Sequence, residues 1–204
     1  MVTPERKGRH WVPLLLMAVL VLCCTALFYA IPLQRKEPAI SKDMPWFSVQ
    51  EGILYFDEAN YTGSSQLTVP EKVNNIPVIA IGDGCFEDCT TLTAILLPNT
   101  LEAIGEEAFR GCTSLRGMEI PASVAFVGKG AFSGCSALEA VCFSNNMRHI
   151  GADALAGCTG LRYIYFLGNY RDWEALYPGF ITADTVIFCD DGSFFQGGAA
   201  YDAP

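Results

Sequence analysis

A unit of 23 residues is written four times between residues 81 and 161, and this repetition constrains the fold more than any other feature. Each copy opens on an aliphatic residue followed by glycine, and the openings lie 23 residues apart at Ile81, Ile104, Val127 and Ile150. A fixed period of roughly 20–29 residues is typical of leucine-rich solenoids. A single coil of this length cannot bury its own apolar side, so we expect the coils to stack in one dimension.

Recurrent slots inside the copies predict two columns of core side chains. The large apolar slot holds Phe86, Phe109, Phe132 and Leu155, and the cysteine slot holds Cys89, Cys112, Cys135 and Cys158. Coils of equal length place like slots against like, so each set is expected to form a continuous buried ladder. We expect one strand and one short helical or 3₁₀ turn in each coil. The predicted fold class is therefore an α/β solenoid.

The cysteine column could in principle bind metal or form disulfides. A zinc site needs four ligands that converge on one ion at about 2.3 Å, whereas stacked coils place equivalent residues in a row about 4.8 Å apart. Disulfides between neighbouring coils are disfavoured by the same row, because their Cβ atoms should lie about 3.8 Å apart. We therefore expect buried free thiols, with no metal and no cofactor.

The segment before the repeats contains an apolar run. Residues 12–33 carry no charge over 22 positions, which is long enough for a transmembrane helix. A cleaved signal peptide is the alternative, but its apolar region usually spans only about 7–15 residues. Three Lys or Arg residues lie on each side of the run, and the short basic start favours a cytoplasmic N-terminus with the repeats outside.

These features divide the chain into seven predicted regions. They are a cytoplasmic tail (1–11), a transmembrane helix in the lipid bilayer (12–33), a linker (34–48), an N-terminal cap (49–80), the leucine-rich repeats (81–166), a C-terminal cap (167–192) and a disordered tail (193–204). The caps are expected because a solenoid needs atypical end units to close its core.

Charge and composition exclude several functions. Beyond residue 50 the chain has 7 Lys or Arg and 19 Asp or Glu, a net charge of −12. Such a domain is repelled by phosphate backbones, so we expect no nucleic-acid partner. The chain has only two histidines and no recognisable nucleophile motif or phosphate loop, so we do not expect an enzyme.

Alternation along the predicted strands identifies side chains that point outward. The candidate binding face consists of Leu96, Glu119, Cys142, Tyr163 and Tyr165, here called the strip. Tyrosine offers contact area with a polar tip, which suits recognition. The two tyrosines would suit packing against the C-terminal cap equally well.

The repeat also resembles a known family. The string Ile-Pro-Val-x-x-Ile-Gly-Asp-Gly-x-Phe-x-x-Cys-Thr-x-Leu-Thr at 76–93, followed by I-G-x-x-A-F-x-G-C-[TS]-x-L, resembles the BspA-like leucine-rich repeats of bacterial surface proteins over about residues 67–166. Three positions depart from that pattern: Cys85, Ser144 and Leu155.

The resemblance has implications for place and function. It implies an extracellular binding or adhesion role. Together with the apolar run at 12–33, we expect a single-pass protein of the bacterial cell membrane whose extracellular repeats bind an unidentified protein or glycan. The alternative is a structural scaffold, or a membrane-tethered regulator of the cell envelope. The family offers no catalytic residues to transfer.

Overall fold

The computed structural model describes residues 44–58, 61, 64–176 and 185–192, and the backbone of 194–196 and 199–200. These residues belong to the second of two units into which the chain divides, Arg35–Pro204. The predicted cytoplasmic tail, transmembrane helix and most of the linker lie outside the described residues. No helix among the residues described combines the length and apolarity that crossing a bilayer requires.

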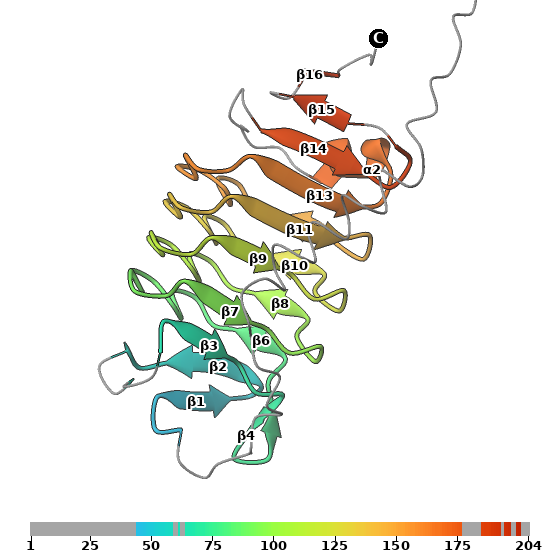
Figure 1. Cartoon of the computed structure of the whole chain (residues 1–204). Helices are drawn as coiled ribbons and strands as arrows, with labels where there is room; N and C mark the ends of the chain where they lie inside the picture. The colour runs from blue at the N-terminus through green and yellow to red at the C-terminus, as the bar shows by residue number, and fades with distance from the viewer. Residues whose placement is uncertain are drawn as a thin grey trace, which may run out of the picture. The chain divides into compact units, whose positions relative to one another are not determined.

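The unit is a solenoid, as predicted, in which successive coils stack along one direction (Figure 1). Sheet 1 has the strand order β16-β15-β14-β13-β11-β9, and the pair β3-β7 continues the same side beyond β9. These strands are β3 (Gln66–Thr68), β7 (Ala94–Leu96), β9 (Gly117–Glu119), β11 (Ala140–Ser144), β13 (Tyr163–Leu167), β14 (Val186–Cys189), β15 (Phe194–Gln196) and β16 (Ala199–Ala200).

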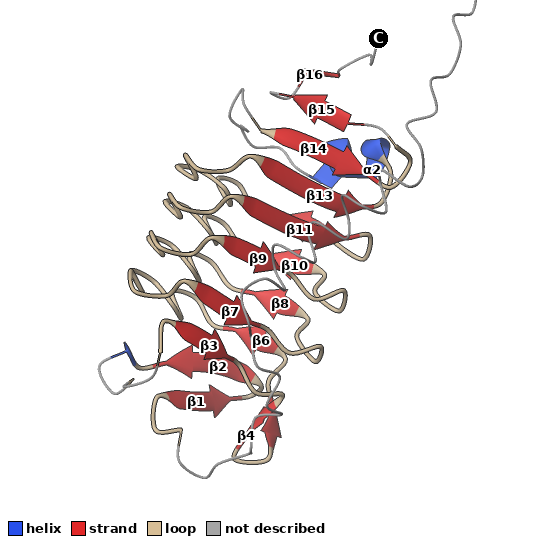
Figure 2. Cartoon of the chain, viewed as in Figure 1, coloured by secondary structure: helices blue, strands red, loops and turns tan. Residues whose placement is uncertain are grey.

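A second sheet corrects the prediction of one strand in each coil (Figure 2). Sheet 2 has the order β1-β2-β6-β8-β10-β12. Its strands are β1 (Phe47–Gln50), β2 (Ile53–Phe56), β6 (Ala80–Ile81), β8 (Ala103–Ile104), β10 (Phe126–Val127) and β12 (His149–Ile150). The aliphatic residue that opens each sequence copy is thus the inward residue of a two-residue strand. Outside both sheets, β4 (Lys72–Val73) pairs with β5 (Ile76–Pro77).

Strand register follows the sequence period. Ala140 of β11 pairs in parallel with Gly117 on one side and Tyr163 on the other, each 23 positions away. The outward and inward alternation expected for β9 is confirmed, because Met118 is fully buried while Glu119 is exposed. Equal coil length therefore fixes which side chains meet across coils.

The segments expected to be helical are hydrogen-bonded turns instead. The N–H groups of Gly84 and Phe86 donate to the carbonyls of Glu106 and Ala108 on the next coil, whereas the N–H of Cys85 donates to Gly82 within its own coil. Hydrogen bonds that alternate between the next coil and the same coil require a residue with left-handed backbone, and Gly84 has a φ of 58°. Among the described residues α-helix is confined to α2 (Tyr170–Leu176), so the α/β label is wrong and the solenoid is a β structure.

The predicted aromatic column lies in the core. Phe86 and Phe109 stack with ring centroids 5.1 Å apart and planes 11° apart, and Phe109 and Phe132 stack at 5.4 Å and 9°. Leu155 occupies the same slot in the next coil and is buried. Each of these side chains covers its equivalent in the neighbouring coil, which no coil could do alone.

The N-terminal end differs from the prediction at its boundary. Phe47 is buried and opens β1, so the last two residues of the predicted linker belong to the folded unit. β1 and β2 form an antiparallel hairpin, and β2 joins β6 in parallel. β3, in the predicted cap, pairs in parallel with β7 and so contributes to the stack.

The C-terminal end also extends further than predicted. Val186 of β14 pairs in parallel with Tyr163, so the period of 23 continues into the predicted cap. The near-helical pattern around Trp173 is α2, as expected, and Trp173 is buried. The predicted disordered tail is wrong at β15 and β16, which add two antiparallel strands to sheet 1.

Candidate binding surfaces

The register of sheet 1 brings four members of the strip into one row. Cys142 pairs with Glu119 on one side and with Tyr165 on the other. Leu96 occupies the equivalent position on β7, 23 residues before Glu119. Tyr163 lies in the adjacent row of β13, two residues before Tyr165. Neighbouring members of the row are separated by one coil, about 4.8 Å.

The strip is accessible along much of its length. Leu96 and Tyr163 keep 38% and 42% of their surface exposed, and Glu119 is also exposed. Cys142 and Tyr165 are half-buried. The row therefore offers an apolar residue, a carboxylate and an aromatic group on one rigid sheet.

Sequence reasoning missed Phe188, which extends the row onto β14. Phe188 pairs with Tyr165, and their rings stack with centroids 5.4 Å apart and planes 15° apart. Tyr163 lies 6.3 Å from Tyr165 and 6.4 Å from Phe188, measured between ring centroids. The signal was present, because Phe188 follows Tyr165 by 23 residues. Tyr165 packs on Phe188 of β14, as expected if the tyrosines pack against the C-terminal cap. The side chain of Tyr163 remains exposed, as recognition would require.

The cysteine column has a role in the core that the sequence did not indicate. The Sγ atom of Cys112 donates to the carbonyl of Phe86 at 3.1 Å, and the same carbonyl accepts the N–H of Cys89 at 3.2 Å. The thiols of Cys135 and Cys158 donate in the same way to Phe109 and Phe132 one coil earlier, at 3.0 and 3.1 Å. Each of these thiols thus fills the cysteine slot of its coil and donates a hydrogen bond to a buried carbonyl.

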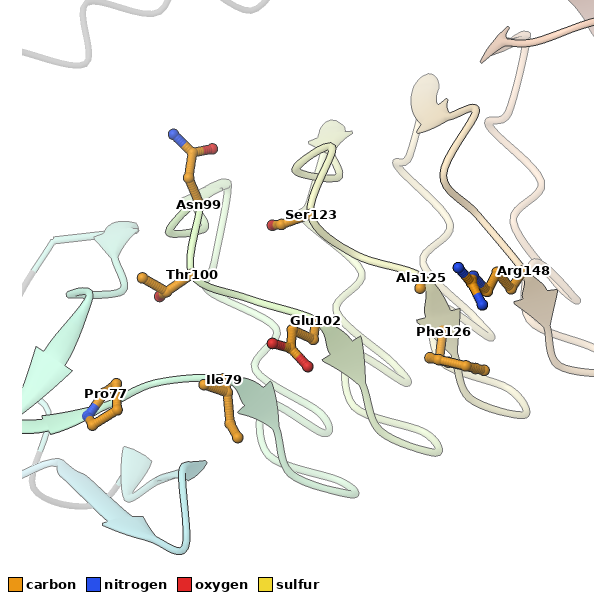
Figure 3. Close-up of a pocket in the computed structure, with 9 residues that line it drawn as sticks. All are labelled: Pro77, Ile79, Asn99, Thr100, Glu102, Ser123, Ala125, Phe126 and Arg148. Carbon is orange, nitrogen blue, oxygen red and sulfur yellow. The ribbon is translucent and has the colours of Figure 1, made fainter.

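A second surface, not foreseen, is an open groove of about 570 Å³ beside sheet 2. Figure 3 shows Ile79, Glu102, Ala125 and Arg148 following one another on successive coils, with Phe126 beside Ala125. These four residues occupy one slot of the repeat, 23 positions apart. Their side chains are chemically unlike, so the pattern did not mark the slot as functional.

With both surfaces located, comparison with known proteins decides the family. A family model described as a BspA type leucine rich repeat region matches residues 60–175 in six copies, more than half of the chain. The chain belongs to this family. The six copies exceed the four that the sequence pattern predicted. No curated protein matches the chain.

Solved structures of bacterial leucine-rich repeat proteins are similar to this chain. A Bacteroides capillosus protein has 25% identity and a TM-score of 0.53, covering 60% of this chain and 93% of its own. A Bacteroides ovatus protein has 24% identity and a TM-score of 0.49, covering 61% and 36%. The T. pallidum leucine-rich repeat protein has 23% identity and a TM-score of 0.48, covering 58% and 67%. This chain therefore spans about a third of the B. ovatus protein.

Three buried thiols of this BspA-type chain have raised pKa values, which makes them poor nucleophiles and poor metal ligands. Burial raises the pKa of Cys85, Cys89 and Cys158 to about 12, so these groups stay protonated at neutral pH. Cys189 is also buried, in β14. Within the ranges that the structure describes, no three His, Cys, Asp or Glu side chains are grouped to hold a metal ion.

Proposed function

We propose that this chain is a membrane-anchored binding protein of the bacterial cell surface. Residues 12–33 anchor it, its N-terminus lies in the cytoplasm, and its BspA-type repeats bind a protein or glycan outside the cell. Membership in the family supports the surface location. The uncharged run of 22 residues supports the anchor. The proposal includes no catalysis and no cofactor.

The observation that carries the binding role is the aromatic cluster at the C-terminal end of the strip. Tyr163, Tyr165 and Phe188 contact one another on adjacent strands of sheet 1, and Tyr163 keeps 42% of its surface exposed. Aromatic residues are enriched in protein interfaces because they supply a large contact area on few rotatable bonds. Stacking on Phe188 holds Tyr165 in place before a partner arrives, which lowers the entropy lost on binding.

Glu119 gives this surface a preference for positively charged partners. It is an exposed carboxylate in the same row as Leu96 and Cys142. The net charge of −12 beyond residue 50 extends the negative potential over the whole domain. Partners that present a cationic group toward the row are attracted during encounter, and anionic partners are repelled.

The test compares variants of the full chain for capture of a partner. One variant combines Tyr163→Ala with Tyr165→Ala, and another carries Glu119→Lys. Capture is measured in two arms, on cell-surface protein extracts and on an array of glycans, which separates the two ligand classes. Tyr55→Ala is the matched control, because Tyr55 is 41% exposed but belongs to sheet 2.

We expect each strip variant to lose at least about tenfold in affinity, as for central interface residues, while its unfolding transition still shows a folded domain. The Tyr55→Ala protein should bind as the unaltered chain does. Equal capture by all four proteins would contradict recognition through the strip and would favour the scaffold role. Protease protection on intact cells tests the anchor separately: digestion of the repeats from outside is expected, and their full protection would overturn the orientation.

A further inference from the structure

The groove beside sheet 2 has apolar walls and a floor of small side chains. Ile79 and Phe126 keep 38% and 51% of their surface exposed and line the groove from different coils. Ala125 precedes Phe126 on the same coil, lines the groove and is half-buried. A small residue beside an exposed aromatic ring leaves room for one apolar side chain of a ligand.

Opposite charges stand at two places in this groove. Glu102 and Arg148 both line it and both are exposed. Throughout the described part of the chain, neither side chain forms an ion pair or a side-chain hydrogen bond. Figure 3 shows Ala125 on the coil between them. The two charges are thus available to a ligand, on either side of an apolar centre.

The separation of these charges identifies the size of the ligand. Glu102 and Arg148 are two coils apart, which corresponds to about 9–10 Å between backbone positions. Three residues of extended peptide span about 10–11 Å. A free tripeptide therefore has about the length of the backbone spacing between Glu102 and Arg148.

We propose that the groove binds a short peptide with free ends, whose ammonium lies at Glu102, whose carboxylate lies at Arg148, and whose middle side chain packs on Ala125 beside Phe126. In an extended tripeptide the middle side chain points away from the other two. It can therefore reach Ala125 and the ring of Phe126. An uncharged glycan uses neither charge, so the charges favour a peptide.

The experiment uses the purified full chain and three forms of one probe. The probe is Ala-Leu-Ala with free ends, the same peptide acetylated at its N-terminus, and the same peptide amidated at its C-terminus. Ligand-detected nuclear magnetic resonance titrations measure the three affinities. We expect each blocked end to lower the affinity about three- to fivefold, as for solvent-exposed ion pairs.

Matched variants assign each end of the peptide to one side chain. Glu102→Gln is expected to weaken the free peptide about three- to fivefold and to leave the acetylated peptide unchanged. Arg148→Gln is expected to weaken the free peptide equally and to leave the amidated peptide unchanged. Glu139→Gln and Arg116→Gln remove the same charges from exposed positions on the side of sheet 1 and should alter none of these affinities.

Three results would overturn the proposal: no binding of the free peptide up to about 10 mM, equal affinity for free and blocked peptides, or equal effects of the groove and control variants. Equal affinity for blocked peptides would indicate an internal protein segment as the occupant. The groove lies beside sheet 2 and the strip on sheet 1, so a negative result here leaves partner capture by the strip intact. Likewise, a negative result for partner capture by the strip leaves peptide binding by the groove intact.

Discussion

The thiol of Cys112 donates a hydrogen bond to the backbone carbonyl of Phe86, 26 positions earlier and one coil away, at 3.1 Å. The carbonyl also accepts the N–H of Cys89, so both of its lone pairs are used in the dry core. A buried carbonyl partnered in this way costs little, whereas an unpartnered polar group is expensive. The repeat therefore places at this slot a residue that is small, apolar and still a donor.

Replacing one of these thiols should destabilise the protein modestly. Cys135→Ala removes the bond to Phe109 and leaves a small void, so we expect the free energy of unfolding to fall by about 1–2 kcal/mol in urea titrations. Cys142→Ala is the control, because Cys142 is half-buried on the surface of sheet 1, and it should cost less than about 0.5 kcal/mol. Equal losses at the two positions would refute a special role for the column.

The buried thiol of Cys85 should make stability depend on alkaline pH. Burial raises its pKa to about 12, whereas an unfolded cysteine titrates near about 8.5. Between these values only the unfolded state loses the proton, so stability falls with rising pH by about 1.4 kcal/mol per unit from this group. Below pH of about 8.5 the contribution is fully present.

Cys85→Ala tests this dependence without disturbing the fold, because the equivalent slots hold Ala108, Ala131 and Ala154. The free energy of unfolding is measured in urea from pH 8 to 10.5. The variant should lose stability less steeply than the unaltered chain. If the free energies of unfolding of the two proteins fell equally with pH, the pKa of Cys85 would not be raised in the folded state.

Two glycines two residues apart should respond differently to alanine. A Cβ at Gly128 would lie 2.5 Å from the backbone nitrogen of Glu106 on the preceding coil, where no side chain can move aside. Gly130 has a φ of 61°, but a Cβ there would meet nothing closer than 3.4 Å. We expect Gly128→Ala to cost about 3 kcal/mol or more and Gly130→Ala about 1–2 kcal/mol. Thermal unfolding of both variants checks the order, and the reverse order would contradict close coil contact.

The aromatic column should tolerate leucine better than alanine. Phe109 is stacked on both faces, by Phe86 and Phe132, so Phe109→Ala opens a cavity across two coil interfaces. We expect a loss of about 3–5 kcal/mol in the free energy of unfolding. Phe109→Leu should cost only about 1–2 kcal/mol, because Leu155 fills the same slot. If leucine and alanine proved equally damaging, ring stacking itself would outweigh volume.

Much of the core was predictable because the period alone aligns it. Phe86, Phe109 and Phe132 needed no tertiary information, since equal coil length places them in one column. Sheet 2 was not predictable in the same way: strands as short as Phe126–Val127 hold too few residues to show alternation. The helical turns were expected wrongly because the sequence does not reveal the left-handed φ at Gly84, which a helical turn cannot contain.

The sequence located outward-facing side chains only where like residues repeat. Tyr163 and Tyr165 stood out as a pair on one strand, but Phe188 was hidden behind the 18 residues between β13 and β14, which do not keep the repeat pattern. The groove escaped notice because Glu102 and Arg148 share a slot yet carry opposite charges. Because Glu102 and Arg148 are separated by two repeat lengths, their sequence positions alone place both residues on one side of the stack.

Excision of a single coil tests most directly the claim that equal coil length organises this protein. Removing Gly105–Val127 deletes 23 residues and joins Ile104 to Gly128, which restores the opening of the unit. Removing only residues 105–126 deletes 22 and shifts every later slot by one. We predict that the first protein keeps a single cooperative unfolding transition in denaturant and that the second has none. If the two proteins unfold alike, the stacking of like slots does not determine this fold.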